Sequence, residues 1–231
     1  MALLNDLHWR YATKKMNGQV VPQDKLDYIL EAARLAPSSS GLQQYKLIVI
    51  SDRALLEKIR TIAYNQSQIT ECSHLLIWAA WDGYNEDRIS ERFNEMMDLR
   101  GLPHGTMDAY KNTILELYKN AGPDWQAHHA AKQSYISFGL AIAAAAEQKV
   151  DATPMEGFLA DQLDELLSLR KDGYRSTVIL PLGYREEAGD WLVNMKKFRL
   201  SKDEFITEMT LADAADIKGT VSLDLNDFAQ K

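Results

Sequence analysis

The stretch from residue 125 to residue 148 constrains the fold most strongly, because its apolar spacing predicts one long helix. Its second half, from Gly139 to Ala146, is rich in alanine and offers little side-chain bulk to hold neighbours apart. The apolar run here, residues 138–146, falls well short of the roughly 18 to 20 residues that a membrane span needs. We therefore expect a buried helix with closely packed neighbours and no membrane segment.

Length and composition indicate one globular domain over residues 1–231, with 46% hydrophobic and 26% charged residues. A formal net charge of -7 argues against a nucleic-acid partner, because binding a phosphate backbone needs dense Lys and Arg on one face. Cys72 is the single cysteine, so it cannot form an intramolecular disulfide, and no signal-peptide pattern opens the chain. These features predict a cytoplasmic location.

Helix and strand patterns alternate along the chain. Helical spacing predicts five further helices, at residues 1–15, 22–35, 55–63, 161–169 and 202–209. Short apolar runs predict four strands, at residues 46–50, 75–81, 152–158 and 176–183. Residues 86–121 are polar and helix-prone with a break near Gly101, so we expect two helices that form an excursion from the core. The tail, residues 210–231, lacks an obvious core face and either frays or packs on another subunit.

Two clusters of cations stand out in this acidic chain. Arg10 and Lys14 are four residues apart and share one face if their segment is helical, so they could hold an anion. Near the end of the folded part, Lys197 and Arg199 would suit a phosphate monoester, Lys as a point charge and Arg as a bidentate fork. Each cluster alone is more simply a solvated basic patch. They gain weight as a site only if the fold brings them together.

Other candidates for chemistry are weaker. His128 and His129 are adjacent and project to different sides of a helix, unlike the i, i+4 pair of a metal-binding helix, so we expect no metal. Cys72 directly precedes an apolar strand, which favours a small buried residue over a nucleophile. The sequence contains no G-x-G-x-x-G, the usual dinucleotide-binding fingerprint.

Six short motifs occur in a fixed order along nearly the whole chain. They are Arg10-x-x-Thr13-Lys14, Pro37-Ser38-Ser39 with Gln43, Asn65, Pro154-x-Glu156-Gly157-Phe158, Pro181-Leu182-Gly183-Tyr184 and Lys197-x-Arg199. Each motif alone is degenerate, but their order and spacing together resemble the FMN-dependent nitroreductase family.

The resemblance implies an α+β fold in which helices flank a central mixed or antiparallel sheet. It implies a homodimer with FMN at the subunit interface and with the C-terminal segment, residues 210–231, exchanged onto the partner. The implied activity is an FMN-dependent oxidoreductase that takes hydride from NADH or NADPH. By a ping-pong mechanism it would pass electrons to a small oxidised organic substrate such as a nitroaromatic or a quinone. The sequence does not choose between the two nucleotides.

The resemblance also implies which residues bind the cofactor. Arg10, Lys197 and Arg199 would hold the FMN phosphate, while Lys14 and Asn65 would approach the pyrimidine edge and ribityl chain. Ser38 and Ser39 would come from the other subunit. Glu156 and Gly157 would lie beside the isoalloxazine ring, with a backbone N–H pointing at flavin N5. Residues that complete these binding segments are Tyr11, Ala12, Thr13, Gln68 and Pro154. No catalytic side chain is implied, since the flavin supplies the chemistry.

Two positions depart from the family pattern. Ala12 stands where family members often carry Ser, and Gln68 stands where some carry a Lys near the pyrimidine. Loss of a cation there should disfavour anionic reduced flavin, so we expect a lower reduction potential than in Lys-bearing relatives. Two other readings remain open. One is a flavoenzyme of the same fold with specialised chemistry, namely dehalogenation, dehydrogenation or flavin fragmentation, and the other is a flavin-binding or interaction protein without turnover.

Overall fold

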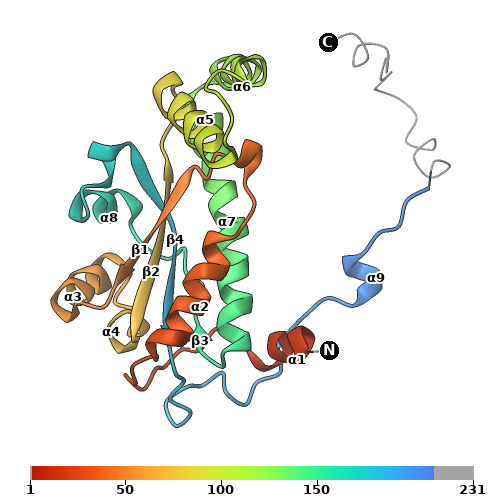
Figure 1. Cartoon of the computed structure of the whole chain (residues 1–231). Coiled ribbons are helices and arrows are strands. Elements are labelled where there is room, and N and C mark those ends of the chain that lie inside the picture. Colours follow the sequence, from red (N-terminus) through yellow and green to blue (C-terminus); the bar gives the residue numbers. More distant parts are fainter. Residues whose placement is uncertain (1, 211–231) are drawn as a thin grey trace. The chain divides into compact units, whose positions relative to one another are not determined.

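A computed structural model describes residues 2–210 of the chain (Figure 1). Residues up to Met195 form one compact unit and those from Lys196 onward form a second, and each is considered by itself. The prediction of a single domain over residues 1–231 therefore stays a prediction. The proposed C-terminal extension, residues 210–231, lies outside the described residues from position 211 onward.

A four-stranded sheet lies at the centre of the first unit. Its strands, in spatial order, are β1 (Tyr45–Ile50), β2 (His74–Trp81), β4 (Tyr174–Gly183) and β3 (Asp151–Ala152). All neighbouring strands are antiparallel, which settles the alternative of a mixed or antiparallel sheet for the described residues. Seven of the eight residues of β2 are buried, because this strand has neighbours at both edges and helices on both faces.

The predicted helices occur in the predicted order, and α4 is an additional short helix that the sequence pattern did not predict. They are α1 (Ala2–Trp9), α2 (Gln23–Arg34), α3 (Arg53–Ile62), α4 (Gln68–Glu71), α5 (Glu86–Arg100), α6 (Asp108–Ala121), α7 (Pro123–Glu147), α8 (Ala160–Leu166) and, in the second unit, α9 (Lys202–Phe205). Two short 3-10 helices are η1 (Ser39–Gly41) and η2 (Leu169–Asp172). In Figure 1, α2 and α7 cover one face of the sheet, and α3, α4 and α8 cover the other.

The long helix α7 is buried and closely packed, as its alanine content predicts. Ala141 and Ala145 are fully buried in the cluster that joins α7, α2 and the sheet. Phe138 meets Trp78 of β2 edge to face, with ring centroids 5.2 Å apart. The Ser137 hydroxyl accepts from the Trp78 indole N–H at 2.9 Å and donates to a carbonyl of α2 at 2.8 Å. Small side chains thus let α2 and the sheet approach α7 and share hydrogen bonds with it.

Residues 86–121 contain two helices, α5 and α6, which lie beyond one end of the sheet (Figure 1). Helix α5 ends at Gly101, whose φ of 65° is the left-handed conformation that favours glycine after a helix. Within residues 2–210, no helix is both long enough and apolar enough to span a bilayer.

Four predicted boundaries are wrong. The first helix ends at Trp9 and not near residue 15, because tertiary hydrogen bonds hold residues 10–16 in an irregular path. The predicted strand 152–158 is only β3 plus one bridge from Met155 to Ile179, since Pro154 has no N–H to donate to a ladder. Helix α8 stops at Leu166 and η2 follows, and α9 covers only the first turn of the predicted helix 202–209.

Candidate functional site

Residues 10–16 are held in place by a buried carboxylate. Asp190 is 3% exposed, and its Oδ2 atom accepts from the Tyr11 hydroxyl at 2.8 Å and the Thr13 hydroxyl at 2.5 Å. The same oxygen accepts from the Lys14 backbone N–H at 3.1 Å, and Oδ1 accepts from the Leu192 N–H at 2.9 Å. Burial raises the pKa of Asp190, but the hydrogen bonds outweigh burial and the net pKa lies below the usual value. Asp190 therefore stays ionised at neutral pH.

A second set of side chains fixes the same segment from the opposite side. The Thr13 carbonyl accepts from the Thr153 hydroxyl at 2.9 Å and from the Gln68 amide at 3.3 Å. Glu71 accepts from the Met16 backbone N–H at 3.2 Å and pairs with the Lys15 ammonium. Segment 10–16 is thus irregular in dihedral angles but well supplied with hydrogen bonds, which is how an irregular path can be stable next to a core.

Tyr11 has a structural role in addition to its bond with Asp190. The Arg185 guanidinium lies 4.4 Å from the Trp9 ring centroid and 4.5 Å from the Tyr11 ring centroid. Arg185 also donates to the carboxylate of Asp151, which is 2% exposed, with a shortest distance of 2.6 Å. Burial and the bond to Asp190 raise the pKa of Tyr11 to about 12, so its hydroxyl remains a donor. The Tyr11 side chain is committed to packing.

This segment carries two cations, Arg10 and Lys14. Arg10 and Lys14 are each partly exposed, and Ala12 between them carries no polar side chain. Lys14 uses its backbone N–H for Asp190, and within residues 2–210 its ammonium has no carboxylate within ion-pair distance. The segment therefore presents positive charge on a fixed backbone, the arrangement that an anionic ligand needs.

A turn at residues 154–158 lies against the loop that contains Asn65. Tyr64 and Asn65 have left-handed φ values of 51° and 56°, and the next residue, Gln66, donates to the Gly157 carbonyl at 2.9 Å. A Cβ atom on Gly157 would lie 3.2 Å from the Gln66 amide nitrogen, so a larger residue would crowd this contact. Because Gln68 and Thr153 also bond the Thr13 carbonyl, three predicted segments meet in this part of the unit.

The turn leaves two adjacent backbone donors available. The N–H groups of Met155 and Phe158 bond the carbonyls of Ile179 and Glu156. Within the described residues, the N–H groups of Glu156 and Gly157 have no acceptor. The Glu156 carboxylate accepts from the Tyr135 hydroxyl of α7 at 2.7 Å. Two neighbouring unpaired N–H groups beside a fixed carboxylate form a donor site for an acceptor atom of a ligand.

The serine loop is not part of this group within one chain. Ser39 and Ser40 contact the other end of the molecule, where the Gln133 amide oxygen accepts from the Ser39 N–H at 2.9 Å and Tyr110 donates to Ser40 at 3.1 Å. Ser38 accepts from the Gln43 N–H at 2.8 Å. This loop precedes the end of β1 that pairs with the end of β2, whereas segment 10–16 lies near the start of β2. The eight residues of β2 separate the two by roughly 25 Å.

The positions of Lys197 and Arg199 relative to segment 10–16 are not described, because both residues belong to the second unit. All described residues of that unit are exposed. The Arg199 guanidinium donates to the carbonyl of Phe198 at 2.6 Å. Their predicted role at a phosphate therefore stays a prediction.

The sequence alone does not predict the residues that hold this site in place. Asp190, Thr153, Glu71, Gln66 and Tyr135 act through hydrogen bonds to residues far away in the sequence, which leave no periodic or local pattern. The only sequence signal is a polar residue that follows or precedes a buried strand, as Glu71 and Thr153 do. Such a signal is too common to select these five.

Two side chains considered for other chemistry have structural partners. His129 shares a hydrogen bond with the Tyr84 hydroxyl at 2.7 Å and stacks on Trp125 with ring centroids 4.5 Å apart. Among the described residues, no three metal-ligating side chains gather. Burial raises the pKa of the Cys72 thiol to about 12, so it is a poor nucleophile, as its place before β2 predicts.

Comparison with known proteins shows which sequences this chain is similar to. The chain is 30% identical over 202 residues to YfkO of Bacillus subtilis, named for NAD(P)H nitroreductase activity, covering 79% of this chain and 88% of that protein. It is 28% identical over 214 residues to the major NAD(P)H-flavin oxidoreductase of Aliivibrio fischeri, covering 89% and 97%.

Solved structures agree on the fold. A nitroreductase-type protein of Exiguobacterium sibiricum, solved in complex with FMN, superposes with a TM-score of 0.74 at 21% identity, covering 90% of this chain and 97% of that chain. The family profile described as "Nitroreductase family" matches residues 7–184, which include all three segments that meet around Thr13 and Gly157. The α+β fold and the resemblance seen in the motifs are confirmed: the chain belongs to the nitroreductase family.

Proposed function

We propose that this chain is an FMN-dependent NAD(P)H oxidoreductase that reduces small oxidised organic molecules such as nitroaromatics and quinones. Family membership and the names of the two sequence relatives support the reaction class. The observation that carries the proposal is the pair of unpaired N–H groups at Glu156 and Gly157, fixed beside a segment that presents Arg10 and Lys14.

The residues present fit a flavin nucleotide. Flavin N5 is a hydrogen-bond acceptor in the oxidised ring, and the Glu156 or Gly157 N–H would donate to it. Gly157 keeps the turn close to Gln66, since a Cβ atom there would crowd the amide at 3.2 Å. Lys14 and Asn65 would lie toward the pyrimidine edge and the ribityl chain. Pro154, Thr13 and Gln68 would line the same side of the site.

The phosphate would be held by Arg10 of segment 10–16 together with Lys197 and Arg199. An Arg fork and a Lys point charge are the groups that phosphate monoesters bind in proteins. Ala12 contributes only its backbone, so this chain lacks the hydroxyl that Ser would add at that position.

When bound, FMN supplies the hydride and electron chemistry between nicotinamide and substrate. The chain would orient the ring through the turn at residues 154–158, which the Gln66 amide holds by its hydrogen bond to the Gly157 carbonyl. Tyr135 holds the Glu156 carboxylate at 2.7 Å, and burial together with this hydrogen bond raises the Tyr135 pKa, so the phenol remains protonated. Donor and acceptor would use the same face in turn, which is a ping-pong mechanism.

An absorbance spectrum of the purified protein, followed by anaerobic addition of NADH and then NADPH, tests the proposal. We expect a flavin band at about 450 nm that bleaches with at least one nucleotide and returns when a quinone is added. A bound flavin that neither nucleotide bleaches would point to specialised chemistry on the same fold. Absence of bound flavin, even after reconstitution with FMN, would overturn the proposal.

The proposed enzyme is a homodimer. Ser38 and Ser39 lie roughly 25 Å from segment 10–16 of their own chain, so they could reach a flavin only in a partner's site. An apolar face supports this assembly: Ile136 and Leu140 of α7 and Leu35 at the end of α2 are all exposed. Faces of this kind on α-helices are typical of subunit interfaces.

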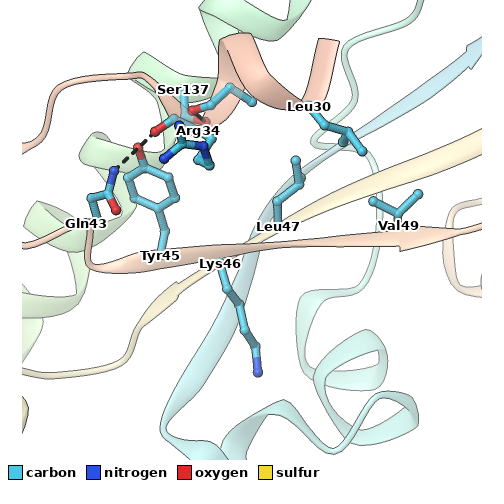
Figure 2. A pocket seen from close by; sticks show the side chains of 9 residues that line it. Leu30, Arg34, Gln43, Tyr45, Lys46, Leu47, Val49 and Ser137 are labelled. Carbon is cyan, nitrogen blue, oxygen red and sulfur yellow. Dashed lines mark hydrogen bonds between the residues drawn. The ribbon is translucent and has the colours of Figure 1, made fainter. Parts of the chain in front are cut away.

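We also propose that the C-terminal segment, residues 210–231, is exchanged onto the partner subunit; from position 211 onward it lies outside the described residues. Strand β1 is an edge strand, and beside it Leu30, Leu47 and Val49 line a cavity of about 280 Å³ (Figure 2). In the sequence, Val221, Leu223 and Leu225 alternate with Ser222 and Asp224. A segment of a partner subunit at the open edge would satisfy its backbone and fill the cavity.

Light scattering of two variants tests this exchange. Leu223→Asp should shift the protein toward monomer because it removes an apolar residue from the exchanged segment, whereas Ser222→Asp, which changes a polar residue, should remain dimeric. Equal dimer fractions in the two variants would exclude the exchange. The cytoplasmic location expected from the sequence stays a prediction.

A further inference from the structure

One buried carboxylate determines the path of the segment that carries Arg10 and Lys14. Asp190 lies 176 residues after Lys14, yet a single oxygen of it accepts from the Thr13 hydroxyl at 2.5 Å and the Lys14 N–H at 3.1 Å. The Tyr11 hydroxyl donates to the same oxygen at 2.8 Å. These donors lie on both sides of Ala12, so the backbone between Arg10 and Lys14 is fixed at three points.

The hydrogen-bond donors around Asp190 compensate for the burial of its carboxylate. A buried carboxylate is destabilising unless hydrogen bonds satisfy it, and Asp190 has four donors, including the Leu192 N–H. Two of them are neutral hydroxyls and two are backbone N–H groups. Lys14 contributes its backbone and not its ammonium, so Asp190 orders the segment without forming an ion pair with that cation.

Asp190 also stands at the start of the segment that leads to the second cluster of cations. Lys197 and Arg199 follow it by seven and nine residues in the sequence. One carboxylate therefore fixes the first cluster, whereas the second belongs to a unit that is considered by itself.

We propose that Asp190 is a positioning residue for flavin binding, which holds residues 10–14 in the conformation that receives the phosphate and pyrimidine of FMN. The inference rests on the proposed function. A ligand that meets a preformed loop does not lose affinity to loop ordering. Loss of the anchor should then weaken FMN binding even though the Asp190 oxygens are occupied by donors of the protein itself.

The test compares Asp190→Asn with Asp164→Asn in the full-length protein, using FMN as the probe. Asp164 is a matched control because it is 1% exposed and accepts from a backbone N–H, that of Ser176, at 2.7 Å and from Arg170 at 2.7 Å. We expect the FMN dissociation constant, from quenching of flavin fluorescence, to rise tenfold or more for Asp190→Asn. For Asp164→Asn it should stay within twofold, although both variants lose thermal stability.

Single-donor variants keep the test informative if Asp190→Asn does not fold. Tyr11→Phe and Thr13→Val each remove one hydroxyl donor and should weaken FMN binding about threefold to tenfold, while Thr13→Ser should restore wild-type affinity. Tyr11→Phe should add little to Asp190→Asn, because both act through the same contact.

Unchanged FMN affinity in Asp190→Asn or in both single-donor variants would overturn the proposal. An equal loss in Asp164→Asn would do the same, since it would reduce the effect to general destabilisation. A wild-type protein that takes up no FMN is a different result, which overturns the proposed function itself.

Discussion

The two cation clusters differ in how much of their geometry is set by the protein. Arg10 and Lys14 lie on a segment whose neighbours Tyr11 and Thr13 are bound to buried Asp190. Lys196 to Arg199 are all exposed, and the described part of their unit, residues 196–210, contains no buried residue. The order that this second unit does show is local, such as the capping box between Ser201 and Glu204 at the start of α9.

Equal charge therefore does not mean equal preorganisation. The first cluster has its position before any ligand arrives, whereas the residues of the second are all exposed. Binding to ordered groups costs less conformational entropy than binding to groups that must be ordered at the same time. We expect the first cluster to contribute more affinity per cation, and this difference can be tested.

The largest expected effect is on the free energy of unfolding, when a residue that holds the first cluster in place is removed. Arg185→Ala removes the guanidinium between Trp9 and Tyr11 and leaves the buried Asp151 carboxylate without its ion pair. Breaking such a pair costs about 3–5 kcal/mol. We expect a loss of about 3 kcal/mol in the free energy of unfolding, measured by urea denaturation.

Lys197→Ala is the control from the other cluster, and its exposed side chain should change stability by less than about 0.5 kcal/mol. Equal midpoints for the two variants would mean that segment 10–16 needs no such support.

The second effect concerns ligand affinity. Arg10→Ala should raise the FMN dissociation constant about 10- to 100-fold, since a hydrogen bond to a charged group contributes about 1.5–3 kcal/mol. Lys197→Ala should raise it less, and its effect should shrink more in high salt, because an exposed cation is more strongly screened. Fluorescence titrations at two salt concentrations provide the comparison. Riboflavin, which lacks the phosphate, should bind both variants as it binds the wild type. A larger effect for Lys197 than for Arg10 would reverse the comparison.

Most of the fold can be predicted from the sequence because its signals are local. The apolar runs of β1, β2 and β4 and the alanine-rich α7 are recognisable in any window of suitable length. The end of α1 could not be predicted, because residues 10–16 leave the helix for tertiary hydrogen bonds that no local pattern reveals. Residues 152–158 read as a strand by apolar content, yet Pro154 and the turn at Gly157 interrupt the ladder.

The residues of the candidate site also divide into those that the sequence predicts and those that it does not. The candidate ligand-binding residues were found by motif order, and three of their segments do meet around Thr13 and Gly157. The roles of Asp190 and Tyr135 could not be predicted, because a residue that acts through hydrogen bonds to distant parts of the chain has the same local sequence as any surface residue. Ser38 and Ser39 show the remaining difficulty: a site that needs two subunits is incomplete in the geometry of one.

A smaller effect should appear in the acid stability of the first cluster. The folded-state pKa of Asp190 is below its ordinary value of about 3.9, so its contribution to stability is complete above that pH and is lost as the pH falls through the folded pKa. Between pH 5 and pH 8, Asp190→Asn should be less stable than the wild type by about 1–2 kcal/mol, a constant difference. Below about pH 4 the difference should narrow. Thermal melts across this range give the measurement, and a gap that instead widens in acid would contradict the assigned ionisation.

The smallest effect concerns the reduction potential. Gln68 is buried in α4 and donates to the Thr13 carbonyl at 3.3 Å, so Gln68→Lys would add a cation beside segment 10–16, which is already fixed. A positive charge near the pyrimidine edge should stabilise anionic reduced flavin and raise the FMN midpoint by about 10–30 mV, on the order of 1 kcal/mol for a two-electron couple. The same charge added by Gln23→Lys, on the exposed start of α2, should leave the midpoint unchanged. A midpoint for Gln68→Lys that is unchanged or lower would show that position 68 serves the Thr13 contact alone. A rise would show that a cation beside the fixed segment stabilises the reduced form of the bound ring. Exposed cations, such as those of Lys196 to Arg199, would do so only weakly because salt screens them.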